Sequence, residues 1–415
     1  MGEAFSDLGF SVRDFGEVCD VYVINTCTVT EESDRKSRQF IRRAIRKNPD
    51  AAVVVMGCYS ERAAEEIAAI DGVGAVIGTV GKMNVPKIAL RLLSGEIKAP
   101  YVHTPSLEGA EFEKMSVRQA PRTRAYVKIE DGCDSHCTYC AIKEARGRVR
   151  SKAPEDVISE VEALAAKGTA EVVLTGIEVA AYGKELGRCY SLSDLLAELD
   201  ARKSCRRIRL GSLAPELIGS DFAERVAGLK ILVPHFHISV QSGANNVLAA
   251  MKRRYTRERA LDNIDRLRAL IPEATFTADI MVGFPGESNE DFLRSVDFVR
   301  RARLLDAHVF AFSRREGTEA YGMAGQIPEC VKRERSRVMI EEKCRVRDSV
   351  LSDIVSSGRL LPSIFESISG EYYTAHSDTF AEIRAMSDTD VRGKLLMVEP
   401  ICHKDGVIYG KIVKM

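Results

Sequence analysis

The sequence predicts an α/β protein in three parts: an open parallel α/β domain over residues 1–105, a partial (β/α)6 barrel over residues 119–350, and a small β-barrel over residues 356–415. Strand-like and helix-like segments alternate in the first part, which is typical of an open sheet covered by helices. A strand followed by a helix recurs through residues 124–312. The last part holds only short β-like runs punctuated by Gly, Asp and Ser.

The composition is that of an ordinary globular protein. Its 415 residues suffice for two or three domains, and 45% of them are hydrophobic. Lys plus Arg equals Asp plus Glu at 60 each, so any contact with RNA must come from local patches. The sequence has no apolar run of membrane-span length and no secretory signal. Eleven cysteines without a disulfide pattern fit a reducing compartment, so we expect a cytoplasmic protein with no membrane partner.

Two cysteines lie at one edge of the first expected sheet. Strands are expected at residues 20–25, 51–56 and 74–78, with helices at 33–47 and 61–70. Cys27 and Cys58 each end a strand, and ligands of parallel sheets bind beyond the carboxyl ends of strands. Each alone is more often an inert buried thiol. Together they indicate ligands of a metal cluster.

Residues 101–123 show scattered charges, two prolines and no firm periodicity, so we expect a linker there. The barrel strands should follow it at residues 124–129, 170–176, 207–210, 235–240, 276–281 and 307–312. Six such strands with outer helices predict a barrel that is open on one side and admits a large substrate. A charged helix over residues 332–350 leads out of it, and short strands are expected at 361–365, 379–383, 395–398 and 407–413.

Three cysteines within eight residues follow the first barrel strand, where α/β barrels place their chemistry. Cys133, Cys137 and Cys140 cannot all pair as disulfides among themselves. Structural zinc sites usually take four protein ligands, and no fourth Cys or His continues the run. Three thiolates therefore suggest an iron–sulfur cubane with one iron open to a non-protein ligand. The alternative is a zinc-binding or redox-sensitive loop.

Polar and Gly-rich segments follow the next four strands, at residues 175–178, 211–216, 241–243 and 283–287. Glycine lets the backbone approach a flat ligand closely, although such turns are also ordinary loops. His235 and His237 alternate along one strand and so share a face. We interpret them as a polar lining of the barrel rather than as a metal site.

The cysteine loop resembles a known signature. Cys-x3-Cys-x2-Cys with Tyr139 before the last cysteine resembles the motif of radical S-adenosylmethionine (SAM) enzymes, and "KIEDGCDSHCTYCAIKEARGRVRS" resembles their methylthiotransferase branch. Within that branch it is most similar to the group that methylthiolates threonylcarbamoyladenosine in tRNA. "VINTCTVTEESDRKSRQ" and "VVVMGCYSER" resemble segments around two cluster cysteines of the branch's N-terminal domain.

The resemblance implies two [4Fe-4S] clusters, one at Cys133, Cys137 and Cys140 and a second held by Cys27 and Cys58. The family's first ligand to the second cluster lies in a Gly-Cys-x-x-Asn segment before the first helix, so we expect the chain to be truncated at its N-terminus. The C-terminal barrel would be an RNA-binding TRAM domain. The residues expected to contact SAM are Thr175, Gly176, Glu178, Ser212, Glu216, Gln241, Gly283 and Pro285.

The activity that the resemblance implies is addition of a methylthio group to C2 of threonylcarbamoyladenosine next to the anticodon. The partners would be tRNA and a low-potential electron donor of the flavodoxin or ferredoxin type, with the sulfur donor left open. Two alternatives remain: a sister enzyme acting on isopentenyladenosine or a ribosomal protein, and an RNA-binding or SAM-cleaving protein that transfers no sulfur. Basic residues at 35–43, 146–150 and 252–254 are candidate RNA contacts or simply solvated faces.

Overall fold

The computed structural model describes residues 1–117, 123–187 and 190–413 and shows two compact units. The N-terminal unit comprises Met1–Met115, Asp131–Arg150 and Ser313–Gly322, and the barrel unit comprises Ser116–Glu130, Ser151–Phe312 and Met323–Met415. The predicted mixture of parallel α/β structure and a C-terminal β-barrel is confirmed. The domain limits expected at residues 119 and 415, and residues 118–122 of the expected linker, lie outside the described residues.

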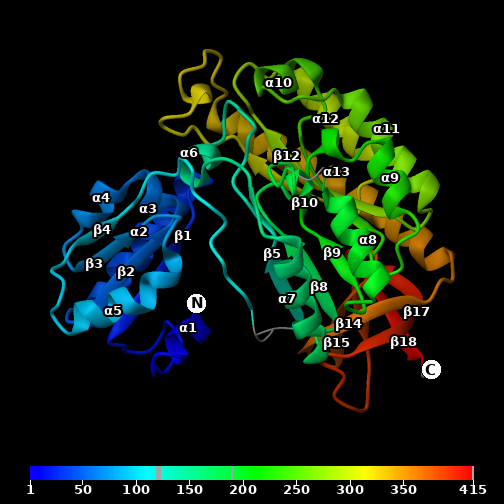
Figure 1. Ribbon diagram of the computed structural model, residues 1–415. Helices are drawn as coiled ribbons and strands as arrows, with labels where there is room; N and C mark the ends of the chain where they lie inside the picture. The colour runs from blue at the N-terminus through cyan, green and yellow to red at the C-terminus, as the bar shows by residue number, and fades with distance from the viewer. Residues whose placement is uncertain (118–122, 188–189, 414–415) are drawn as a thin grey trace. The chain divides into compact units, whose positions relative to one another are not determined.

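The N-terminal unit is built on one parallel sheet of four strands (Figure 1). In sheet order they are β1 (Val21–Thr26), β2 (Ala52–Gly57), β3 (Val73–Ile77) and β4 (Tyr101–His103). Every residue of β2 and β3 is buried, as expected for parallel strands covered on both faces. β1 pairs directly with β2 along its whole length, so the sheet is continuous.

Helices cover both faces of this sheet. One face carries α2 (Glu31–Lys47), α3 (Cys58–Arg62) and α4 (Ala64–Ala68), and the other carries α1 (Gly2–Ser6) and α5 (Val85–Leu93), the latter preceded by η1 (Lys82–Asn84). α2 begins where the side chain of Thr30 accepts a hydrogen bond from the backbone of Ser33. Its Ile41 and Ala44 then pack into the core under β1 and β2.

Two details of the prediction for this unit are wrong. Residues 101–103, expected to be linker, form β4, because a three-residue strand is too short to show alternation. The helix expected at residues 61–70 is two helices, since Ala63 leaves the helical region with φ −132° and ψ 43°.

The barrel unit contains six parallel strand positions, and the predicted partial (β/α)6 barrel is confirmed. They are β5 (Arg124–Lys128), β8 (Glu171–Thr175), β9 (Ile208–Leu210) continued by β10 (Ser212–Leu213), β11 (His235–Gln241), β12 (Thr275–Val282) and β13 (Asp306–Ala311). Two short strands, β6 (Glu130–Asp131) and β7 (Arg150–Ser151), flank the cysteine loop in the sequence.

Helices surround the outer face of these strands (Figure 1). They are α7 (Pro154–Ala166), α8 (Leu192–Arg202), α9 (Ser220–Val226), α10 (Asn245–Ala250), α11 (Arg257–Leu270) and α12 (Asn289–Arg301), with η2 (Val179–Ala181) and η3 (Pro215–Leu217) between strands and helices. On β11 the apolar Phe236, Ile238 and Val240 join the helix-covered core. The alternate residues His235 and His237 therefore face the barrel interior, as predicted for a polar lining.

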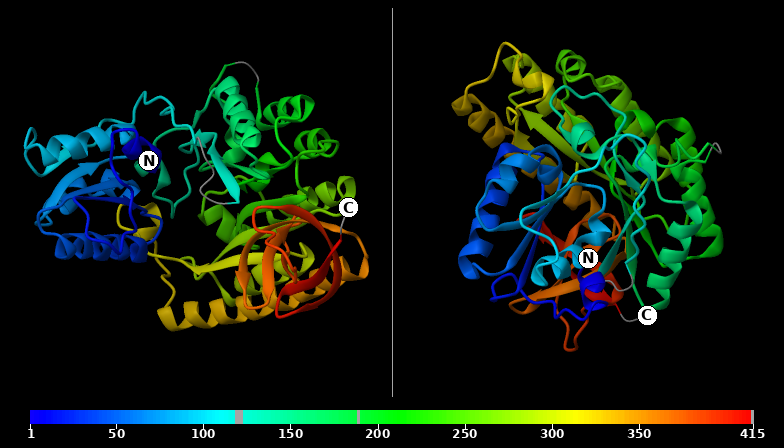
Figure 2. Two further views of the ribbon diagram at one scale, coloured as in Figure 1. Left: turned by 90° about the horizontal axis from the view of Figure 1, so that it is seen from below. Right: turned by 60° about the vertical axis from the view of Figure 1, so that its left-hand side comes forward.

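The long helix α13 (Glu329–Ser356) leads to a closed five-stranded barrel (Figure 2). Its strands are β14 (Leu361–Ser369), β15 (Tyr372–Ser377), β16 (Glu382–Ala385), β17 (Leu395–Lys404) and β18 (Val407–Val413). β15 was not predicted, and the strand expected at residues 379–383 is mostly a turn in which Phe380 adopts φ 68°. No helix in the described part of the chain has the length and apolar composition needed to cross a bilayer.

A buried carboxylate joins the N-terminal ends of three barrel strands. Glu171 of β8 contacts Arg124 of β5 (2.9 Å), Arg207 just before β9 (2.5 Å) and Arg209 of β9 (3.0 Å). Burial alone would raise the pKa of Glu171, but the three guanidinium groups outweigh burial and lower it to about 2. Glu171 is therefore an anion shared by three cations.

The C-terminal barrel covers this same end of the strands. Arg209 donates a hydrogen bond to the carbonyl of Ser377 (3.1 Å), and its guanidinium lies 5.0 Å from the ring centre of Phe380. Phe380 also stacks on His235 at 4.5 Å. Burial and the charge of Arg209 hold the pKa of His235 well below its ordinary value, so a neutral imidazole meets the ring. The opposite ends of the strands remain for ligands.

We expect Glu171→Gln to lower the free energy of unfolding by about 3–5 kcal/mol, because three buried cations lose their shared counter-charge. Urea titration at neutral pH, followed by circular dichroism, measures this loss. Because the folded pKa of Glu171 is about 2 against an ordinary 4.5, the advantage of the wild type should shrink as pH falls from 4.5 toward 2.

The matched control is Glu334→Gln. Glu334 pairs with Arg337 on the exposed face of α13, where water screens the interaction, so this variant should unfold almost like the wild type. Equal losses in the two variants would contradict the role assigned to Glu171.

Candidate functional site

Cys27 and Cys58 follow neighbouring strands of the N-terminal sheet. The parallel register pairs Thr26 of β1 with Gly57 of β2, and each cysteine is the next residue along its chain. The two thiols therefore leave the same edge of the sheet, as the sequence predicted, with Cys58 buried and Cys27 exposed. Cys19 precedes β1 and so belongs to the opposite edge.

The two chain segments meet closely at this edge. Gly57 has φ 110°, and a Cβ atom there would lie 2.5 Å from the carbonyl oxygen of Thr26. Only glycine fits such a close approach. The hydroxyl of Thr26 donates to the carbonyl of Met56 (2.8 Å) and accepts from the backbone of Ser60 (3.4 Å). These contacts hold the start of α3, and with it Cys58, against the end of β1.

The three-cysteine loop belongs to the same unit. Gly132 turns the chain into the loop with φ 88°, and a Cβ atom there would lie 1.9 Å from the carbonyl oxygen of Arg148. Backbone N–H groups of Ser135 and Ile142 each donate to a cysteine sulfur, Cys133 and Cys140 respectively, at 3.4 Å. Such donors stabilise thiolates, which is the form that binds metal.

Arg146 connects the loop to the N-terminal sheet. It lies at the end of α6 (Ile142–Arg146), donates to the sulfur of Cys58 (3.0 Å), and contacts both oxygens of Asp131 (3.1 and 3.2 Å). Burial opposes its charge, but Asp131 and Cys58 outweigh burial and raise the pKa of Arg146. A cation is thereby held against one of the candidate ligand sulfurs.

A buried arginine contacts Thr28, the residue that follows Cys27. Arg315 contacts Asp34 of α2 at 2.8 Å and the hydroxyl of Thr28, and all three side chains are almost fully buried. It comes from the segment after β13, which folds into the N-terminal unit. Segments far apart in the sequence thus position the residue next to Cys27.

The donor set fits iron–sulfur clusters better than single ions. Within residues 1–117, 123–187 and 190–413, no three His, Cys, Asp or Glu side chains are grouped so that they could hold one metal ion. A cubane differs from a single ion because each thiolate binds a different iron, so its ligands lie farther apart. The loop supplies three thiols, of which Cys133 and Cys140 accept backbone N–H hydrogen bonds, and the sheet edge supplies two more.

The residues expected to contact SAM lie at or just beyond the C-terminal ends of the barrel strands. They are Thr175 at the end of β8 with Gly176 and Glu178 after it, Ser212 on β10 with Glu216 on η3, Gln241 at the end of β11, and Gly283 and Pro285 after β12. The alternation of strands and helices therefore carries all eight to one end of the barrel unit.

The segment after β8 is held by a buried glutamate. One carboxylate oxygen of Glu130 accepts hydrogen bonds from the backbone of Ile177 and Glu178, both at 2.8 Å. A Cβ atom on Gly176 would lie 2.6 Å from that oxygen, so glycine is required. Sequence reasoning named Gly176 but missed Glu130, since a glutamate before a cysteine motif carries no distinctive spacing.

The pKa of the Glu178 carboxyl is raised. Burial raises its pKa to about 7, the nearby Glu216 carboxylate adds to the rise, and the hydrogen bond from the backbone of Ala214 (3.0 Å) only partly opposes it. The structure thus brings Glu178 and Glu216 together. Within the described residues, one buried oxygen of Glu216 and the side-chain oxygen of Gln241 have no hydrogen-bond partner. Orphaned acceptors of this kind fit a polar cofactor.

Gly283 and Pro285 lie in a tight backbone turn after β12. Gly283 has φ 74°, and a Cβ atom there would lie 2.4 Å from Lys332 of α13. Its N–H donates to Glu287 (3.0 Å), which pairs with Arg335 (2.6 Å). Pro285 is buried in the same turn.

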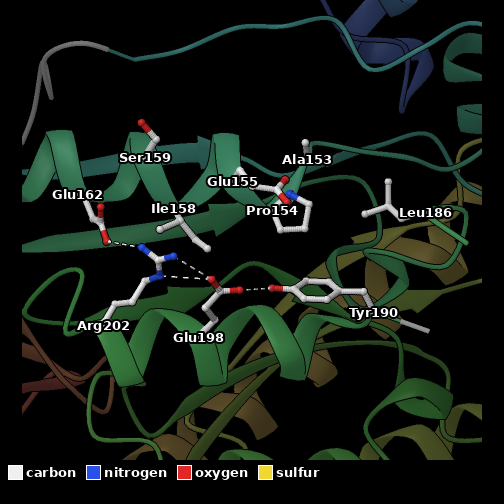
Figure 3. A pocket seen from close by; sticks show the side chains of 10 residues that line it. All are labelled: Ala153, Pro154, Glu155, Ile158, Ser159, Glu162, Leu186, Tyr190, Glu198 and Arg202. Carbon is white, nitrogen blue, oxygen red and sulfur yellow. Dashed lines mark hydrogen bonds and ion pairs between the residues drawn. The ribbon is translucent and has the colours of Figure 1, made fainter. Parts of the chain in front are cut away.

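A pocket elsewhere in the barrel unit does not contain these residues. It has a volume of about 470 Å³ and lies between α7 and α8 (Figure 3). Arg202 stands between Glu198 and Glu162 at its rim, and Tyr190 donates to Glu198 (3.1 Å). Its charged groups satisfy one another, so we assign it no ligand.

One group of expected RNA contacts is corrected. Arg146 and Arg150, expected to be candidate RNA contacts or solvated, both pair with Asp131; Arg150 is buried and Arg146 half-buried, whereas Arg148 between them is exposed. Sequence reasoning missed this role because Asp131 looked like part of a turn.

The sequence of this chain is similar to known protein families and to individual enzymes. Residues 127–299 match the radical SAM superfamily, and residues 1–78 match the uncharacterized protein family UPF0004. The chain is 36% identical to threonylcarbamoyladenosine tRNA methylthiotransferase MtaB of Bacillus subtilis over 96% of this chain and 89% of that protein. It is 36% identical to tRNA-2-methylthio-N(6)-dimethylallyladenosine synthase of Carboxydothermus hydrogenoformans over 80% and 77%.

A solved structure shares the fold. It is the radical SAM methyltransferase TsrM from Kitasatospora setae, with cobalamin and a [4Fe-4S] cluster bound, at a TM-score of 0.57 and 18% identity over 77% of this chain and 72% of that chain. This likeness concerns architecture alone.

We expect the thiols of the loop to account for about four iron atoms per chain. After reconstitution without oxygen, the triple variant C133A/C137A/C140A should therefore contain about four fewer irons than the wild type, as measured by iron and sulfide analysis. The control is Cys402→Ala, which removes an exposed thiol on β17 and should keep the wild-type iron content. A triple variant that retains all the iron would refute the assignment.

Proposed function

This chain belongs to the radical SAM methylthiotransferase family, and on that basis we propose that it adds a methylthio group to C2 of N6-threonylcarbamoyladenosine next to the anticodon of a tRNA. The observation that carries the proposal is the similarity to enzymes of that name along nearly the whole chain. Family membership also sets the cofactors, which are [4Fe-4S] clusters and SAM.

The N-terminal unit would hold the clusters. Cys133, Cys137 and Cys140 would bind one of them and leave an iron open, and Cys27 and Cys58 would contribute to the other. When bound, the clusters and SAM would supply the one-electron chemistry that takes hydrogen from C2, and the second cluster would deliver the methylated sulfur, whose donor is left open. Arg146 donates to the Cys58 sulfur, and a donor there tunes the potential of an attached cluster.

The barrel unit would orient SAM. The Glu130 carboxylate fixes the backbone of the segment that carries Thr175, Gly176 and Glu178. Glu178 and Glu216 together present carboxylate oxygens to the cofactor's amino and hydroxyl groups, and Gly283 with Pro285 forms a tight turn suited to a flat adenine.

The tRNA would be recognised by several surfaces. An adenosine in an anticodon loop is already single-stranded, so presenting it costs less than flipping a base out of a duplex. We assign the closed β-barrel of strands β14–β18 to RNA contact, together with the exposed cations Arg42, Arg43 and Lys252. The electron donor would be a flavodoxin or ferredoxin of the cytoplasm.

Nucleoside mass spectrometry tests the activity. Purified enzyme, reconstituted without oxygen and given SAM, sulfide and a reductant, should convert threonylcarbamoyladenosine in tRNA to its 2-methylthio derivative. Transfer RNA carrying dimethylallyladenosine at the same position is the comparison substrate. Product on the second tRNA and none on the first would replace this proposal with the sister activity.

The acidity of Glu178 predicts how SAM binding depends on pH. An ionised carboxylate accepts hydrogen bonds from SAM, so affinity should rise as pH increases through about 7 and fall roughly tenfold for each pH unit below it. Equilibrium dialysis with radiolabelled SAM measures this. Glu178→Gln should remove the pH dependence in this range, whereas Glu290→Gln, at an exposed position on α12, should keep it. An unchanged profile in Glu178→Gln would exclude contact with SAM.

A further inference from the structure

A chain of polar side chains crosses the interior face of the last three barrel strands. The hydroxyl of Thr277 lies 2.9 Å from Nδ1 of His237, and Nε2 of His237 lies 3.3 Å from Asp279. The other oxygen of Asp279 lies 3.2 Å from Nδ1 of His308. The strand register explains this order, because it places His237 beside Thr277 and Asp279 beside His308.

This arrangement presents His308 at the open side of the barrel unit. β13 is the last strand of its sheet, and 72% of the His308 side chain is exposed, against 23% for Asp279. The contact through Nδ1 leaves Nε2 as the outward nitrogen. The ring of Phe310, two residues further along the same face of β13, lies 5.3 Å from that of His308. An oriented imidazole therefore stands beside an aromatic surface.

Asp279 keeps the imidazole oriented. Burial alone would raise the pKa of Asp279, but the hydrogen bonds and charges of His237 and His308 outweigh burial and lower it. An ionised Asp279 accepts from both histidines. His237, Asp279 and His308 are not arranged as a metal site, since the described residues contain no group of three His, Cys, Asp or Glu side chains placed to hold an ion.

We propose that His308 reads the N6 substituent of the substrate adenosine as an imidazolium, with Nδ1–H donating to Asp279 and Nε2–H donating to the carboxylate of the substituent. The inference rests on the proposed function, since a threonylcarbamoyl group carries a free carboxylate and a dimethylallyl group is a hydrocarbon. Phe310 offers the adjacent ring a flat surface to stack on.

The same residues would reject the hydrocarbon substituent. A dimethylallyl group placed against His308 and Asp279 would displace water from both and return no hydrogen bond. Sites built around hydrogen bonds discriminate strongly against analogues that lack the partner group. His308 and Asp279 would therefore favour the threonylcarbamoyl substituent and disfavour the dimethylallyl substituent.

Binding to matched anticodon stem-loops tests the inference separately from catalysis. Two loops differ only in the N6 substituent of the adenosine next to the anticodon, which is threonylcarbamoyl in one and absent in the other. Fluorescence anisotropy with the full-length reconstituted protein gives the ratio of the two dissociation constants. The wild type should prefer the threonylcarbamoyl loop, and His308→Phe should reduce that preference by about tenfold to a hundredfold.

Three further variants complete the test. His308→Gln keeps a hydrogen-bond donor on a shorter side chain and should retain part of the preference, and Asp279→Asn, which misorients the imidazole, should lose part of it. His103→Phe, the same substitution on β4 of the N-terminal unit, should retain all of it.

A wild type without preference, or a His308→Phe variant that keeps it, would overturn the inference. Neither result touches the proposed function, which the nucleoside assay decides. Absence of methylthiolated product alongside a His308-dependent preference would sink the function and leave the binding assignment standing.

Discussion

The barrel unit depends on one buried carboxylate shared by three arginines. Glu171 joins strands β5, β8 and β9, and the remaining N–H groups of its partner Arg209 bind carbonyls of the C-terminal barrel. A buried charge is tolerated only when it is paired and hydrogen-bonded, so strands and C-terminal barrel must assemble together. Because one end of the strands is covered in this way, polar groups that serve ligands can gather at the other end and along the open side.

The N-terminal unit is organised by close approach of backbones. Gly57 allows the ends of β1 and β2 to meet, and Gly132 turns the chain into the three-cysteine loop; neither position has room for a side chain. Arg146 then ties the loop to Cys58. Five cysteines from two distant stretches of sequence thus belong to one compact unit. A rigid frame of this kind suits clusters, whose potential depends on hydrogen bonds to sulfur and on exposure.

Much of the fold was predictable from local pattern. Buried parallel strands such as Ala52–Gly57 are continuous apolar runs, and the repeated strand–helix order indicates a barrel whatever the tertiary detail. The three-cysteine motif could also be recognised from the sequence, because its spacing is a local property. Short elements such as β4 were not predicted, since three residues show no periodicity. In the C-terminal barrel, β15 was not predicted and the strand was expected instead at the following turn, around Phe380. Glu130, Arg315 and Asp279 escaped prediction because their roles come from partners far away in the chain.

The sequence by itself indicated the class of chemistry, since the three-cysteine motif resembles that of radical SAM enzymes. It also determined that Cys27 and Cys58 leave the same sheet edge, since parallel strands end together. Only the tertiary structure decided which charges are buried, that the pKa of Glu178 is raised to about 7, and that His308 is exposed. Those properties depend on packing between strands such as β12 and β13, where Asp279 meets His308, and no local pattern encodes which side chain a neighbouring strand will supply.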